Sequence, residues 1–240
     1  MKAVGMSDIG RCRQNNEDAY YIAEPNFPIP YCYIVADGMG GCNAGEVASQ
    51  TAIAAFSSYI QTQANQQEIP DLLTASFQAA NKAVFDKSNT SLEFAEMGTT
   101  MVAAIIQKEK AYIAHVGDSR AYLLQDDVLH LLTTDHSYVM ELVQKGNITK
   151  EQAATHPKRN IITRAVGIKD MLETDVAIHD VKKGDLLLLC TDGLSGMLSD
   201  IELEEFLHRK MSLKKKVKGL VDIANKKGGF DNISLVLIEI

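Results

Sequence analysis

Short runs of apolar, β-branched and aromatic residues, separated by polar turns, recur along much of the chain. Runs of this kind are typical of buried β-strands. They predict strands over residues 3–9, 19–22, 31–36, 98–106, 110–116, 120–124, 128–132, 185–190 and 233–240. Polar turns at 108–110 and 125–127 connect strands in the middle of the chain, and such short connections favour antiparallel pairing over βαβ units.

Apolar residues recur at helical spacing in several longer segments. Residues 45–62 carry an apolar stripe that includes Phe56, and a second stripe that includes Phe77 begins near Pro70. Both stripes are interpreted as facing the core rather than as binding surfaces. Two further helices with lysine-rich outer faces are predicted at residues 201–210 and 213–226.

The pattern is least regular between residues 138 and 167, and residues 132–137 lead into it. Asp135 or Ser137 is a candidate N-cap for a helix there. Residues 138–167 are interpreted as either a flap over a site or a plain surface excursion. Because no internal repeat or low-complexity tail is visible, residues 1–240 are predicted to form one α+β domain with about ten strands and four main helices.

The composition is that of an ordinary globular protein, with 46% hydrophobic and 23% charged residues. The formal net charge of −7 argues against nucleic acid or an anionic membrane as a partner. The cysteines are scattered without the paired spacing of a zinc site, as expected of reduced intracellular thiols. No signal peptide and no run of ~20 apolar residues is visible, so we expect a soluble cytoplasmic protein.

Residues 34–46 combine a buried strand, one carboxylate and several glycines. Asp37 follows the apolar strand, and four glycines come within the next eight residues. Glycine lets the backbone approach a ligand closely. A carboxylate beside glycine backbone, whose carbonyl oxygens are accessible, suits a hard cation that takes oxygen ligands. The alternative interpretation of this segment is an ordinary tight turn that contains an aspartate.

Other carboxylates favour the cation. Asp192 closes a second apolar strand, Asp231 precedes the last strand, and Glu17 and Asp118 lie in turns. Several converging buried carboxylates need cations, because an unpaired buried charge is costly. Oxygen ligands indicate Mg²⁺ or Mn²⁺ rather than zinc. Two such ions would about balance four carboxylates, lower the pKa of a bound water and hold an anionic substrate.

Two neighbouring features refine this hypothesis. Glu17 and Asp18 point to opposite faces if their segment is extended, so at most one of them faces a shared site directly. Arg13 is a candidate phosphate clamp, because a guanidinium matches phosphate oxygens in bidentate fashion.

Other catalytic patterns are absent from the sequence. Asn43 stands where a dinucleotide fingerprint needs its third glycine, and no phosphate loop with Gly-Lys-Ser/Thr occurs. Ser119 and Ser195 lie outside any nucleophile elbow. His115 and His136 are candidate bases, with a structural role as the alternative.

Seven short motifs occur in a fixed order along the chain: Arg13-x-x-Asn16-Glu17-Asp18-Ala19, Val35-Ala-Asp37-Gly38-Met-Gly-Gly41, Gly98-Thr-Thr100, Gly117-Asp118-Ser119-Arg120, Thr134-Asp135-His136-Ser137, Thr191-Asp192-Gly193 and Asp231-Asn232. Together they resemble the metal-dependent serine/threonine protein phosphatases, the PPM or type 2C family, in their short bacterial form. The resemblance covers about Gly5 to Ile240. It implies a four-layer αββα sandwich, in which two antiparallel sheets are flanked by helices, and a binuclear Mn²⁺ or Mg²⁺ centre.

The resemblance also implies a role for each matching residue. Asp37 would bridge the two ions and Gly38 would offer its carbonyl oxygen. Asp192 and Asp231 would complete one metal site and Glu17 the other.

A weaker third metal would lie between Asp118 and Asp192. Asp18 and Asn232 would support the ligands from behind, and Arg13 would hold the phosphate. The residues thereby assigned to catalysis are Arg13, Asp37 and Asp192.

The sequence departs from the family at one position. Bacterial members commonly have histidine after Met-Gly-Gly, where this chain has Cys42. That histidine is a candidate proton donor to the leaving alkoxide, so the resemblance leaves the donor unidentified here. Residues 138–167 lie where the family carries its flap.

The resemblance implies hydrolysis of phosphoserine and phosphothreonine in proteins by a metal-bound hydroxide, without a covalent phosphoenzyme. The expected partners are phosphorylated proteins and a serine/threonine kinase, and we expect a monomer. One alternative is a phosphatase dedicated to a single regulatory phosphoprotein. Another is a pseudophosphatase that binds phosphoproteins without turnover, favoured only by Cys42. A calcium-binding module is a third, although no loop with calcium-hand spacing occurs.

Overall fold

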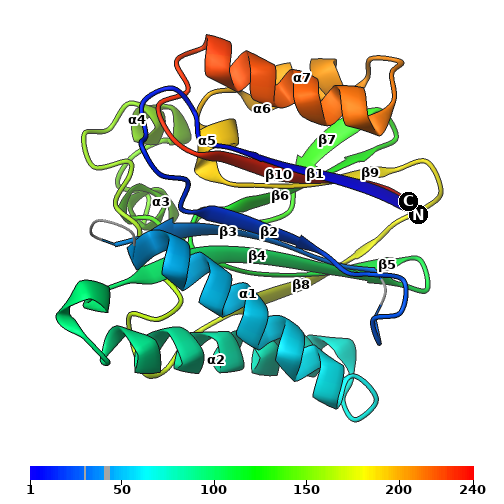
Figure 1. Ribbon diagram of the computed structural model, residues 1–240. Helices are drawn as coiled ribbons and strands as arrows, with labels where there is room; N and C mark the ends of the chain where they lie inside the picture. Colours follow the sequence, from blue (N-terminus) through cyan, green and yellow to red (C-terminus); the bar gives the residue numbers. More distant parts are fainter. Residues whose placement is uncertain (30, 41–43) are drawn as a thin grey trace.

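The computed structural model describes residues 1–29, 31–40 and 44–240. Two five-stranded sheets pack face to face and helices cover both outer faces (Figure 1). Sheet I has the order β1 (Lys2–Asp8), β10 (Ile233–Glu239), β9 (Leu186–Cys190), β6 (Arg120–Gln125) and β7 (Val128–Leu131). Sheet II has the order β2 (Asp18–Ile22), β3 (Cys32–Met39), β4 (Gly98–Gln107), β5 (Lys110–Val116) and β8 (Asp175–Asp180). All strand pairs are antiparallel, which confirms the predicted α+β sandwich.

The four main helices form the outer layers. Helices α1 (Ala44–Gln63) and α2 (Ile69–Ser88) cover sheet II, and α6 (Asp200–Leu207) and α7 (Leu213–Lys226) cover sheet I (Figure 1). Consecutive residues of β3 show how the strands serve two cores, because strand side chains alternate between faces. Ile34 packs toward the α1–α2 layer, whereas Val35 packs between the sheets.

Two strands differ from the sequence expectations. β8 was not predicted, because as an edge strand it is only partly buried and its apolar residues are few. β3 continues past its predicted end, since its pairing with β4 runs on through Gly38 and Met39. Asp37 therefore lies within the strand, not after it.

Short helices gather at the end of the sheets opposite the chain termini (Figure 1). They are α3 (Tyr138–Gln144), α4 (Lys150–Ala154) and α5 (Asp192–Ser195), and a 3₁₀ turn, η1 (Leu92–Phe94), lies elsewhere. The predicted cap is confirmed, because the Ser137 hydroxyl accepts the Met140 amide at 3.4 Å. Isolated bridges join Ser137 to Ile162 and Thr99 to Val166. Among the described helices, none is long and apolar enough to span a membrane.

Candidate metal centre

The predicted ligands come from strand ends of both sheets. Asp37 lies near the end of β3 and Asp18 at the start of β2, in sheet II. Asp192 begins α5 directly after β9, Asp231 precedes β10, and Asp118 lies in the turn between β5 and β6. Because these strand ends meet at one end of the sandwich, residues far apart in sequence share one site.

Asp18 and Asp37 are direct neighbours across the antiparallel β2–β3 pair, so their side chains share a face. Burial, followed by the Asp18 charge, raises the pKa of Asp37 well above its usual range. Burial raises the pKa of Asp18 to about 7, although the Thr191 hydroxyl donates to its carboxylate at 2.9 Å. Holding both carboxylates ionised is therefore unfavourable without a cation.

Asp192 and Asp118 extend this cluster. Burial, and then the charge of Asp231, raises the pKa of Asp192. Burial, and then the charge of Asp192, raises the pKa of Asp118 to about 7. One carboxylate oxygen of Asp192 and one of Asp18 are buried without a hydrogen-bond partner. Unsatisfied buried acceptors of this kind fit cation ligands or their close supports.

Two glycines, Gly38 and Gly45, allow Glu17 to lie close to the acidic cluster. A Cβ on Gly38 would lie 2.0 Å from the Gly45 carbonyl oxygen, and one on Gly45 would lie 2.8 Å from a Glu17 carboxylate oxygen. The Gly38 amide also donates to the Glu17 carbonyl at 3.1 Å. Burial raises the pKa of Glu17. The glycines noted in the sequence are thus needed so that β3, α1 and Glu17 can pack together.

Asn232 fixes the loop that carries Glu17. Its carboxamide nitrogen donates to the carbonyl oxygens of Ile9 and Asn15, both at 2.9 Å. Its carboxamide oxygen accepts the Glu17 amide at 2.8 Å. The supporting role expected of Asn232 therefore has a physical basis in three hydrogen bonds to backbone groups.

Arg13 lies at the rim of the cluster. Its guanidinium pairs with Asp231 at 2.8 Å, and the Arg13 side chain is 48% exposed. This hydrogen bond raises the pKa of Arg13, and the charges of Glu17 and Asp37 act in the same direction. A half-exposed cation beside the predicted ligands can meet an incoming phosphate.

The donor set fits hard divalent ions, since it consists of carboxylate and backbone oxygens. Among the described residues, the group of three candidate ligands with atoms within 4.8 Å of one another is His115, His136 and Asp175.

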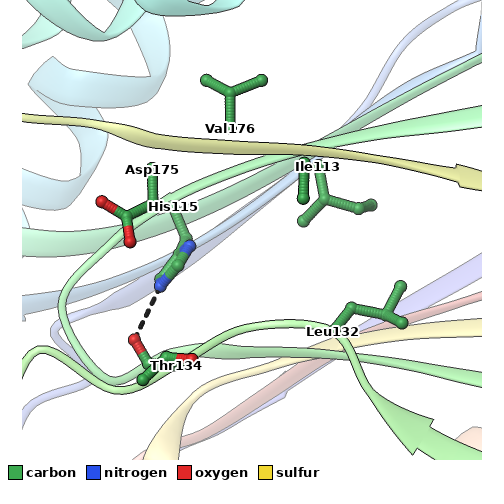
Figure 2. A pocket seen from close by; sticks show the side chains of 7 residues that line it. Ile113, His115, Leu132, Thr134, Asp175 and Val176 are labelled. Carbon is green, nitrogen blue, oxygen red and sulfur yellow. Dashed lines mark hydrogen bonds between the residues drawn. The ribbon is translucent and has the colours of Figure 1, made fainter. Parts of the chain in front are cut away.

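His115 and Asp175 of this group line a separate pocket of about 370 Å³ (Figure 2). His115 Nε2 lies 2.9 Å from the Thr134 carbonyl oxygen, and the His115 ring stacks on His136 at 4.6 Å. Burial lowers the pKa of both rings. Closely stacked imidazoles do not face a common ion.

Hydrogen bonding also argues against a metal between these histidines. The Gly117 amide donates to His136 Nδ1 at 3.1 Å, so the neutral ring carries its proton on Nε2, which lies 3.3 Å from Asp175. Arg164 pairs with the same carboxylate at 2.9 Å and already supplies its positive charge. These contacts support the structural alternative for both histidines.

Some site residues were not singled out from the sequence. Thr191 was quoted within a motif without a role, yet its hydroxyl holds Asp18. Arg120 pairs with both carboxylate oxygens of Asp135, at 2.8 and 2.7 Å. A polar residue ending an apolar strand was the available signal for Thr191. Cys42 lies outside the described residues, so its role stays a prediction.

Comparisons with known proteins agree with this site. The family described as protein phosphatase 2C matches residues 10–232. A serine/threonine phosphatase of Listeria innocua is 42% identical over 242 residues, covering 100% of this chain and 96% of that protein. The S. agalactiae serine/threonine phosphatase superposes with a TM-score of 0.91 at 35% identity, over 100% of this chain and 99% of that one.

A further solved structure bears on the metal. The catalytic domain of the serine/threonine phosphatase PstP, in complex with two manganese ions, has a TM-score of 0.87 and 33% identity. It covers 99% of this chain, and this chain covers 97% of it. The family resemblance drawn from the motifs is thus confirmed.

Proposed function

Since the chain belongs to the protein phosphatase 2C family of serine/threonine phosphatases, we propose that it hydrolyses phosphoserine and phosphothreonine esters of proteins at the acidic cluster, with Mn²⁺ or Mg²⁺ bound. The observation that carries this proposal is the convergence of buried carboxylates, with one oxygen of Asp18 and one of Asp192 unpaired. The manganese complex of the related catalytic domain supports the choice of ion.

We assign the ligands as the motifs predict. Asp37, Asp192, Asp231 and the Gly38 carbonyl would hold one or both of two ions, with Glu17 on the second. Asp118, with Asp192, would form a weaker third site. When bound, the ions neutralise the phosphate and lower the pKa of a water so that it can act as nucleophile.

The chain's own residues position the substrate and the ligands. Arg13 exchanges part of its contact with Asp231 for the phosphate oxygens and orients the phosphorus toward the cluster. Asn232 keeps Glu17 in place. We propose direct attack by water, without a covalent phosphoenzyme, as the family resemblance implies. The buried imidazoles of His115 and His136 contact the Thr134 carbonyl oxygen and Asp175 respectively, which fits a structural role for both rings.

This assignment defines the partners we propose. They are phosphorylated proteins and a serine/threonine kinase, which adds the phosphate groups that this protein would remove. The phosphatase name of the Listeria innocua relative supports the substrate class.

The test is phosphate release from a phosphothreonine peptide with Mn²⁺ and with EDTA. Turnover should require Mn²⁺ and should be lost in Asp192→Ala, since that change removes a buried cluster carboxylate. Asp170→Asn, an exposed change, is the control and should keep wild-type turnover. Equal turnover in EDTA would overturn metal dependence, and no turnover with any divalent ion would leave a phosphoprotein-binding module.

A further inference from the structure

A groove of about 810 Å³ leads away from the acidic cluster. Its inner end is lined by Asp118 and Asp192, and it continues between helices α3–α4 on one side and the start of α6 on the other. Figure 1 shows α3, α4 and α5 together at this end of the sheets. A group bound at the cluster would therefore continue directly into the groove.

The outer part of the groove offers apolar contacts from both walls. Ile201 projects from the first turn of α6 and is 71% exposed, whereas the α6 residues Leu203 and Phe206 pack into the core. Met140 of α3 lines the same groove. An exposed Ile201 adds little to the packing of α6, so its side chain is available to a bound molecule.

The outer part also carries two cations, Lys150 and Arg159, and the structure shows no ion pair for either of them within the described residues. Lys150 begins α4, where the helix dipole disfavours positive charge, so this lysine does not stabilise its own helix. Lys145 nearby, unlike Lys150 and Arg159, pairs with Glu141. Lys150 is thus free to meet an acidic group.

The charges along the groove differ between its two ends. The carboxylates of Asp118 and Asp192 line the inner end, and the charge of Asp135 is neutralised by Arg120. Asp200 also lines the groove and accepts a hydrogen bond from the Tyr122 hydroxyl at 3.1 Å. With cations bound, the inner end would accept a phosphate, and Lys150 and Arg159 add positive charge farther out. This distribution fits a ligand with a phosphate and a second acidic group.

We propose that the groove selects substrates by binding the peptide segment next to the phosphorylated residue. A carboxylate of that segment pairs with Lys150, and an apolar side chain packs against Ile201 and Met140. This inference rests on the proposed phosphatase function and adds a substrate class to it: phosphoproteins with acidic and apolar residues on one side of the phosphoresidue.

The test compares a small aryl phosphate, which cannot reach the groove, with phosphothreonine peptides in which glutamate and leucine are moved through the flanking positions. For the best peptide, Lys150→Glu should raise KM about tenfold and leave kcat unchanged, an effect that high salt reduces. Ile201→Ser should lower kcat/KM about tenfold for the leucine-containing peptide.

The controls separate this inference from the proposed function. Lys215→Glu makes the same charge change on the exposed face of α7 and should leave both substrates unaffected. Turnover of the aryl phosphate should be unchanged in every variant. If Lys150→Glu and Ile201→Ser hydrolyse the peptides with the kcat and KM of the wild type, the groove proposal is wrong and the proposed phosphatase function is unaffected. If the wild type hydrolyses neither substrate, both proposals fail.

Discussion

Replacing the buried Asp18 with asparagine should stabilise the metal-free protein at alkaline pH. Asp18 is 8% exposed and lies opposite Asp37, and its pKa of about 7 compares with an ordinary value of 3.8. A shift of about 3 units, at about 1.4 kcal/mol each, sets a ceiling of about 4 kcal/mol on the cost of ionising Asp18 in the fold. Asparagine keeps the size of the side chain and an acceptor for the Thr191 hydroxyl, but the hydrogen bond is no longer to a charged group. We therefore expect Asp18→Asn to raise the free energy of unfolding by about 2 kcal/mol.

The pH dependence gives the sign of the effect. Because the folded pKa of Asp18 is raised, the folded state binds more protons than the unfolded state between about pH 4 and pH 7. The stability of the wild type should therefore fall as pH rises through this window. The benefit of Asp18→Asn should be only about a third of its full value at pH ~5 and complete at pH ~8.

Urea denaturation of the wild type and Asp18→Asn in EDTA, at pH ~5 and pH ~8, measures this difference in free energy of unfolding directly. Asp170→Asn removes an exposed carboxylate and should show no such pH dependence. Mn²⁺ should reduce the difference in free energy of unfolding between the wild type and Asp18→Asn, because bound cations offset the repulsion between the carboxylates of the cluster. An Asp18→Asn protein that is no more stable than the wild type at pH ~8 would refute the proposed electrostatic cost.

Three further changes probe the supports of the site. Gly38→Ala should lower the melting temperature and manganese affinity together, because its Cβ would lie 2.0 Å from the Gly45 carbonyl oxygen; unchanged affinity would contradict the close packing. Asn232→Ala removes three buried hydrogen bonds and should cost about 2–4 kcal/mol in urea unfolding, with a loss below about 1 kcal/mol counting against its role. Arg120→Ala should cost about 3–5 kcal/mol, because it leaves Asp135 unpaired, and adding Asp135→Ala should recover part of that loss.

Local patterns were sufficient to predict most of the fold. The stripe through Phe56 marked α1, because this helix buries one face against sheet II. The apolar run after Asp185 marked β9, because this strand is buried on both faces. Strand β8 escaped prediction because an edge strand buries few side chains, and Ile178 is 50% exposed. Asp37 lies within β3 because pairing with Thr100 extends the strand, which the apolar pattern alone did not show.

The site could be predicted only in part, because it depends on long-range contacts. The motifs identified the carboxylates, but the pairing of Asp18 with Asp37 follows from strand register. Asn232 reaches Glu17 across a sequence separation of 215 residues, which no local pattern encodes. The stacking of His115 on His136 likewise appeared only in three dimensions. Ligand roles and the function of Cys42 stay predictions.

The central claim is that the acidic cluster is a divalent-metal centre that drives phosphoester hydrolysis. The most direct measurement is a titration of metal-free protein with Mn²⁺, in which bound metal and phosphate release from a phosphothreonine peptide are followed together. We predict that turnover rises with the binding of two ions per chain, and that Asp37→Asn loses both. Full turnover in the metal-free protein, or undiminished metal binding in Asp37→Asn, would contradict the account.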